Sequence, residues 1–499
     1  MKKYISVLFI VFAITSSGCK KNYLELSTNP NLPIAVTPGL LLSGALAGTA
    51  SVLNGYTKAN SGNYYTSYTM YACWIGYLSN SPGGGALQLV QYAFISSNFD
   101  MWTKIYLNLS NYNALGKSTT EPYYLAIDKI MLAFNFEQLV DNYNDVPYTE
   151  AFSASLTPKY DKGSAIYDDL LKQLDAAMVM IQNAPASATN PGTSDIMYGG
   201  NMQNWLKFAN TLKLRIAIRQ SNLTAKAAIL KSAVAATSAI GYLDSTNPAT
   251  VNPGYLDSDA NGGEQSPLWM NYGYTQSGSA QTNNSSYMAN SYGVNFYLNH
   301  NDPRAKQVYA VNPSGNLVAD PFGATVTTPA GLTPSRVGPG VLQSPTMNAI
   351  IMSAPEALFL QAEAASTGLI SGNAQTLYNA GITASFENLL VTNPDAAALA
   401  YYTQPNIAFP VAGTPAQQQK AIIVQKWAAL NPYGALEAFN EFRRTGYPDD
   451  IPLSVYPGAN APNQITRLYY PASEYQTNAA NVGAEGTIDK FSSKIFWAK

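Results

Sequence analysis

The stretch SAPEALFLQAEAASTGLISGNAQTLYNAGITAS, residues 353–385, decides the fold class of this chain. Ser353 and Glu356 have the spacing of a capping box, and a proline lies in the first turn that would follow. Leucine and alanine then recur at helical spacing up to Gly368, which predicts the end of that helix. A second apolar stripe covers 374–385, so the stretch predicts two helices joined by a tight turn.

This helix pair has the size of a tetratricopeptide repeat, which is about 34 residues long. A second pair follows, in which Thr414 and Gln417 form another capping-box signature. Its last helix ends at Arg443 and Arg444, before a glycine and a proline, so both arginines are predicted to be structural. Ser164 is the predicted N-cap of an earlier helix. The upstream segments with helical spacing are 120–140, 164–182 and 205–216. The chain is therefore predicted to be mostly α-helical.

A loop-rich stretch over about 241–345 interrupts the helical pattern. It is dense in Gly, Asn, Ser, Thr and Pro, and His300 lies in a predicted turn within it. Long stretches of this kind are typical of binding loops, and their aromatic residues predict that these loops are ordered. Since no charged or low-complexity linker divides the chain, residues 38–499 are predicted to form a single domain.

The N-terminus has the pattern of an export signal over 1–18. Two lysines precede an apolar run at 4–14, which is too short to span a bilayer. Cys19 follows Ser-Ser-Gly and resembles the acylated cysteine of a bacterial lipobox, so we expect a lipid on Cys19 and a tether over 19–37. An ordinary secretory peptide is the alternative.

The amino-acid composition limits the classes of ligand that we expect the protein to bind. The chain has 28 basic and 30 acidic residues without a basic cluster, which argues against nucleic acid as a partner. Charged residues make up only 12% of the chain, whereas Tyr alone numbers 35. A surface that is polar through hydroxyl and amide groups suits neutral, hydroxyl-rich ligands.

Few residues are suited to metal binding or catalysis. With one histidine, and only Cys73 besides Cys19, a zinc site is excluded, and no metal, cofactor or catalytic residue is predicted. Glycoside hydrolysis needs only two carboxylates, and their spacing in the fold cannot be derived from the sequence. The candidates are Glu264, Glu356, Glu363 and Glu437.

Several segments, taken in order, resemble the SusD/RagB family of Bacteroidetes outer-membrane lipoproteins, in its SusD-like subgroup. Each segment is weak alone, but their order makes the joint match specific and nearly full-length. The segments are Cys19–Lys21 with Asn29–Asn31, Asn142–Tyr148, Trp205–Arg215, Pro355–Ala364, Glu437–Pro448, and Arg467–Pro471 with Ser473–Tyr475.

The resemblance implies a mostly α-helical fold with four tetratricopeptide-like helix pairs and a less regular region packed against them. It also implies a glycan-binding lipoprotein of the outer membrane that is not an enzyme. Such a protein faces the cell exterior and delivers oligosaccharide to a SusC-like TonB-dependent transporter. Two alternatives remain open: a lipid-anchored glycoside hydrolase, and a peptide-binding or scaffold subunit.

Two aromatic clusters are the predicted sugar-binding residues, because flat rings stack on the C–H faces of sugars while amides bind their hydroxyls. The alternative for both clusters is burial in the core. Trp102, Trp205 and Trp427 are predicted core residues, and Trp497 is predicted to anchor the C-terminal segment. The first cluster is Trp74, Tyr77 and Asn80, and the second is Trp269, Asn271, Tyr272 and Tyr274.

Overall fold

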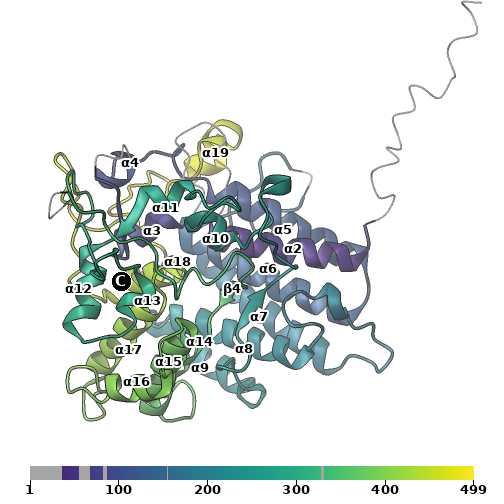
Figure 1. The fold of residues 1–499 in the computed structure, drawn as a ribbon. Helices are drawn as coiled ribbons and strands as arrows, with labels where there is room; N and C mark the ends of the chain where they lie inside the picture. The colour runs from purple at the N-terminus through teal and green to yellow at the C-terminus, as the bar shows by residue number, and fades with distance from the viewer. Residues whose placement is uncertain (1–35, 56–67, 83–86, 154, 328–330) are drawn as a thin grey trace, which may run out of the picture.

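The chain is mostly helical (Figure 1), which confirms the predicted fold class. The computed structural model describes residues 36–55, 68–82, 87–153, 155–327 and 331–499. The signal segment and Cys19 lie outside these ranges. The long N-terminal helices are α2 (Pro38–Asn54), α5 (Met101–Ser118), α6 (Pro122–Tyr143), α7 (Gly163–Gln182) and α8 (Met202–Arg219). The helices between residues 354 and 445 are α14 (Ala354–Ser366), α15 (Ala374–Asn388), α16 (Pro394–Tyr402), α17 (Pro415–Ala429) and α18 (Ala435–Thr445).

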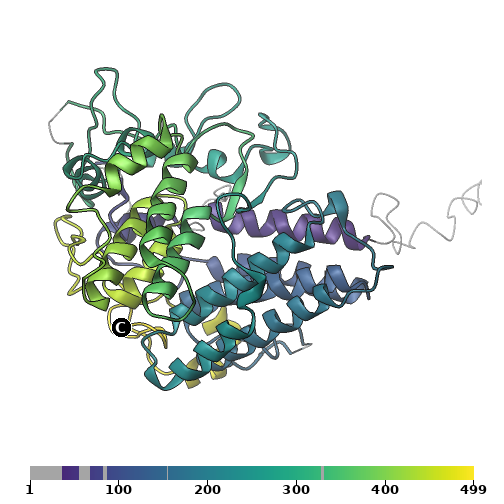
Figure 2. The same ribbon diagram turned by 90° about the horizontal axis from the view of Figure 1, so that it is seen from below.

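Helices that follow one another along the chain pack against each other, and the pairs of α14 with α15 and of α17 with α18 are the two that the sequence pattern predicts. The pairs are α5 with α6, α7 with α8, α14 with α15, and α17 with α18. Figure 2 shows the C-terminal helices gathered on one side of the molecule and the N-terminal helices on the other. Helix α6 is apolar on most of its faces and is buried along most of its length, because α2, α5, α7 and α8 all pack against it.

The loop-rich stretch contains short elements that the composition did not predict. Two antiparallel pairs join it to the rest of the fold, β1 with β3 and β2 with β4. The longest of its helices, α12, covers part of the stretch that contains His300, which lies at the C-terminal end of that helix. The strands are β1 (Leu78–Asn80), β2 (Ala249–Val251), β3 (Tyr287–Ala289) and β4 (Ala349–Met352). The short helices are α3 (Thr69–Trp74), α4 (Leu87–Val90), α9 (Ala227–Ala236), α10 (Pro267–Tyr272), α11 (Thr282–Ser286), α12 (Ser291–Asn299), α13 (Ala305–Val308), α19 (Ala472–Thr477) and α20 (Ala479–Ala484), with 3-10 turns at Gly192–Ser194, Thr224–Lys226, Ser238–Ile240 and Ala260–Gly262.

The predicted helix caps have three different outcomes. The capping box of α17 is complete, with Thr414 and Gln417 each accepting a hydrogen bond from the other's backbone N–H. At α14 only half of the box forms: Ser353 accepts from the backbone N–H of Glu356, whose own carboxylate binds an arginine instead. The prediction that Ser164 is an N-cap is wrong, because α7 begins at Gly163 and Ser164 lies inside the helix. The side chain of Asp145 accepts from the backbone N–H of Gly163.

A network of buried ion pairs joins the N-terminal helices to the C-terminal ones. Arg215 of α8 donates to Glu137 of α6 and, at 2.9 Å, to Glu356 of α14. This competing partner explains the missing half of the capping box, because the Glu356 carboxylate balances the charge of the buried arginine instead of accepting from the cap backbone. Burial opposes the ionisation of Glu437, but neighbouring cations, Arg219 foremost, hold its pKa well below the usual range. Further ion pairs join Arg219 to Glu437 and Glu441, Lys426 to the same two carboxylates, and Arg444 to Glu363 and Glu441.

The C-terminal segment is fixed in the core beside α6. The indole Nε1 of Trp497 donates to Asp141 at 3.0 Å, and the guanidinium groups of Arg219 and Arg443 lie over its ring. Both the predicted anchoring role of Trp497 and the structural role of Arg443 are confirmed. The predicted core tryptophans are buried as well, and they are Trp102, Trp205 and Trp427.

Candidate functional site

The first predicted sugar-binding cluster lies in the core. Trp74 is only 1% exposed, and its indole is surrounded by aromatic rings. The Tyr77 hydroxyl donates to the carbonyl of Trp427 at 2.5 Å, and the Asn80 side chain accepts from the backbone N–H of Gly323. Rings enclosed in this way have no free face for a sugar, so the alternative of burial describes this cluster. The rings that contact Trp74 are Tyr71, Tyr92, Phe94, Phe99 and Phe439.

The second predicted cluster is divided between core and surface. Asn271 and Tyr272 are buried, and they bond to the carbonyl of Asn54 and the hydroxyl of Thr69. Trp269 is half-buried and Tyr274 is 40% exposed. Their ring centroids are 6.2 Å apart, and the indole Nε1 donates to the Tyr274 carbonyl at 2.9 Å. Only these two rings of the cluster are therefore available at the surface.

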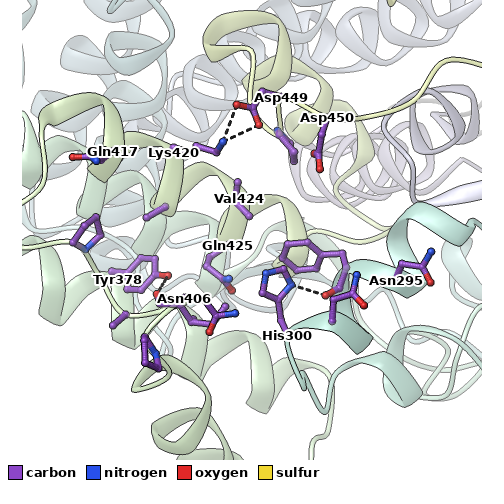
Figure 3. Close-up of a pocket in the computed structure, with 18 of the residues that line it drawn as sticks. Asn295, His300, Tyr378, Asn406, Gln417, Lys420, Val424, Gln425, Asp449 and Asp450 are labelled. Carbon is purple, nitrogen blue, oxygen red and sulfur yellow. Dashed lines mark hydrogen bonds and ion pairs between the residues drawn. The ribbon is translucent and has the colours of Figure 1, made fainter.

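A pocket of about 610 Å³ lies between the loop-rich stretch and the C-terminal helices (Figure 3). Its walls come from α12, from the chain between α16 and α17, from α17 itself, and from the segment that follows α18. No sequence pattern predicted it. The residues used below are Tyr292, Asn295, Phe296, Asn299, His300, Tyr378, Asn406, Ile407, Lys420, Gln425, Asp449 and Asp450.

The floor of the pocket is held rigid by buried hydrogen bonds. Gln425 accepts from the guanidinium of Arg304 at 3.0 Å and donates to the hydroxyl of Tyr401 at 3.1 Å. The hydroxyl of Tyr378 donates to the carbonyl of Ile407 at 2.6 Å. These side chains have used their hydrogen-bonding groups within the protein, so the pocket is already formed before any ligand enters.

Other polar side chains of the pocket are free to bind a ligand. His300 Nδ1 lies 2.6 Å from the Phe296 carbonyl. Because a carbonyl only accepts, the neutral imidazole carries its proton on Nδ1, which leaves Nε2 as an acceptor. Among the described residues, no hydrogen bond is recorded for the exposed amide side chains of Asn295, Asn299 and Asn406. The pocket thus offers several neutral donors and acceptors.

Charged groups gather at one edge of the pocket, and His300 and Asn406 lie toward the opposite edge (Figure 3). Lys420 donates to both oxygens of Asp449, at 2.9 and 2.7 Å. This bonding raises the pKa of Lys420 and lowers that of Asp449. Asp450 accepts from the hydroxyl of Tyr292 at 2.5 Å. Burial, reinforced by this carboxylate, raises the pKa of Tyr292, so its hydroxyl remains a neutral donor.

Two aromatic rings of α12 complete the wall. Tyr292 and Phe296 both pack edge-on against the buried Trp427, with centroid distances of 5.5 and 5.0 Å. A signal for this wall exists in the sequence, because Tyr292, Phe296 and His300 are spaced four residues apart and share one helical face. The high Gly, Asn and Ser content of the stretch concealed that spacing.

The glutamates considered for glycoside hydrolysis either bind a basic side chain in the core or lie on the surface. Glu356, Glu363 and Glu437 are buried and bonded to arginine or lysine, whereas Glu264 accepts from Asn261 in a surface loop. The described residues contain no group of three or more His, Cys, Asp or Glu side chains placed to hold a metal. Among the described helices, none combines the length and the apolar character that crossing a bilayer requires.

Comparison with known proteins shows which family the chain belongs to. Residues 30–471 match the family model described as "Starch-binding associating with outer membrane". No curated protein sequence matches the chain. A chitin-binding SusD homologue from Flavobacterium johnsoniae superposes with a TM-score of 0.76 at 21% identity, over 91% of this chain and 98% of that one. A SusD homologue from Bacteroides fragilis gives 0.74 at 23% identity, over 93% and 99%. The chain therefore belongs to the SusD-like family of starch-binding, outer-membrane-associated proteins.

Proposed function

We propose that this protein binds oligosaccharide at the outer membrane and passes it to a SusC-like TonB-dependent transporter. The observation that carries the proposal is the pocket of Figure 3, where two aromatic rings and unpartnered neutral amides line one preformed cavity. A sugar presents apolar C–H faces and a dense set of hydroxyls, so it needs both kinds of wall. Chitin, the ligand named for a structural neighbour, is one member of the class that we propose.

The direct test is calorimetry of the protein from residue 22 onward against a panel of soluble oligosaccharides, with release of reducing ends measured in the same samples. Saturable heat without new reducing ends supports a binding protein. New reducing ends would instead favour the lipid-anchored hydrolase, and absence of both signals would favour the peptide-binding or scaffold alternative.

The membrane anchor and the transporter are the remaining parts of the proposal. Acylation of Cys19 would hold the protein at the membrane surface. We expect the full-length chain to fractionate with outer membranes, and Cys19→Ala to shift it to the soluble fraction. Co-purification of the tagged chain with a TonB-dependent barrel would support the partner. Membrane fractionation of Cys19→Ala equal to that of the parent would contradict lipid anchoring.

Trp269 is proposed as a sugar-stacking residue outside the pocket, because it is the sequence-predicted tryptophan that lies partly at the surface. For a glycan identified by the panel, we expect Trp269→Ala to weaken binding by about 1–3 kcal/mol, the range for an interfacial aromatic. Stability should change little, which thermal unfolding can verify. Tyr475→Ala, at another exposed aromatic, is the matched control. Equal affinity of Trp269→Ala and the parent would remove Trp269 from the site.

A further inference from the structure

The charges that line the pocket do not cancel. Lys420 and Asp449 neutralise each other as a close ion pair. Asp450 has a neutral phenol as its recorded partner, and none of the ion pairs among the described residues includes it. Among the Lys, Arg, Asp and Glu side chains that line the pocket there are one ammonium, Lys420, and two carboxylates, Asp449 and Asp450, so negative charges exceed positive ones by one.

This excess charge is held in place at the edge of the pocket. The Tyr292 hydroxyl fixes Asp450 from α12, whereas Asp450 itself lies in the segment after α18, so the carboxylate is positioned between two walls. The Lys420 ammonium also interacts with the charge of Asp450, but it donates its hydrogen bonds to both Asp449 oxygens, and one cation cannot balance two carboxylates. A ligand carboxylate that entered here would meet Asp450 without an available cation.

We propose that this pocket selects uncharged sugars and disfavours glycans that carry uronic acids. The inference rests on the proposed function and narrows its substrate class. Repulsion between like charges near a protein surface is modest and is screened by salt. We therefore expect a uronate at the pocket to weaken binding about three- to fivefold at low ionic strength. The difference should shrink as salt is added.

The test compares matched hexasaccharides by calorimetry at neutral pH and low salt. In the first pair, an oligomer of galactose is compared with an oligomer of galacturonate. In the second pair, an oligomer of xylose is compared with the same oligomer that carries a single glucuronate branch. The variant is Asp450→Asn, which keeps an oxygen that can accept from Tyr292 and removes only the charge. The control is Asp168→Asn, an exposed residue of α7 that makes the same change in total charge outside the pocket.

The neutral member of a pair should bind more tightly to the parent, and in Asp450→Asn the ratio of the two affinities should fall close to one. Asp168→Asn should preserve it. Equal binding of neutral and acidic members, or a preference that survives in Asp450→Asn, overturns the inference but leaves glycan binding intact. Failure of these saccharides and of the whole oligosaccharide panel to bind contradicts the proposed function, and the inference with it.

Discussion

Replacing Arg215 with methionine should lower the free energy of unfolding by about 3–5 kcal/mol at neutral pH, the range for removing one partner of a buried ion pair. Its guanidinium is almost fully buried and bonds to both Glu137 and Glu356, which are themselves buried. Methionine fills much of the same volume but leaves two carboxylates without their counter-charge. Urea unfolding monitored by circular dichroism measures the change.

The loss of stability in Arg215→Met should depend on pH in a definite direction. Burial raises the pKa of Glu137 to about 7, although Arg215 opposes the rise. A carboxyl group whose pKa is raised in the folded state destabilises the fold as pH increases from its unfolded value, near 4.3, toward the folded one. Removal of Arg215 raises the folded pKa further. Glu137 is then protonated in both folded proteins below about pH 6, so the difference between Arg215→Met and the parent should be nearly constant there and grow as the pH rises through about 7.

A partly exposed ion pair provides the control for Arg215. Lys207 binds Asp244 at 3.4 Å where both side chains remain in contact with solvent, so Lys207→Met should cost less than about 1 kcal/mol. A loss of similar size in both variants would mean that the buried network contributes no more than a surface contact. The same conclusion would follow if the loss in Arg215→Met were independent of pH.

Trp74→Ala is expected to have a comparable effect on stability, about 3–5 kcal/mol, because it removes the largest side chain from an aromatic core. The neighbouring rings Tyr92, Phe94 and Phe99 lie in the segment between α4 and α5 and are themselves buried, so they fill the vacated space only in part. Thermal unfolding of the parent and the variant measures the loss.

The outcome for Trp74 separates the two interpretations of its sequence pattern. A sugar-stacking residue would lose affinity on truncation and keep its stability, as predicted for Trp269. Truncation of a core residue lowers the stability of the protein. Trp74→Phe should lower it less than Trp74→Ala, because an aromatic ring remains in the core. Unchanged unfolding of Trp74→Ala would contradict its role in the core.

The helices could be predicted from sequence because their signals are local. The caps, apolar stripes and terminal glycine of 353–385 lie within one helix pair, and α14 and α15 follow them closely. The failures at Ser164 and Glu356 share one cause, since distant side chains, Asp145 and Arg215, supply the decisive hydrogen bonds. A local pattern does not contain that information.

The pocket could not be predicted for a related reason. Its walls join residues near 295, 378, 406, 420 and 450, and their alignment depends on how α12 packs against Trp427. Asparagine and glutamine also have no characteristic spacing that marks a binding role. The aromatic clusters were visible in the sequence, but tyrosine and tryptophan serve cores and sugar sites equally well, and only burial distinguishes the two.

The bonds around Asp141 and Trp497 have a consequence for how the chain is made. These two residues are 356 positions apart, and the nearby bond from Leu468 to Asn142 also spans more than 300. A ribosome produces α6 long before the segment that covers it. The polar groups and apolar faces of α6 that this segment covers therefore remain open to solvent until the last residues have been synthesised. This interval is when a nascent protein of this design most needs protection from aggregation.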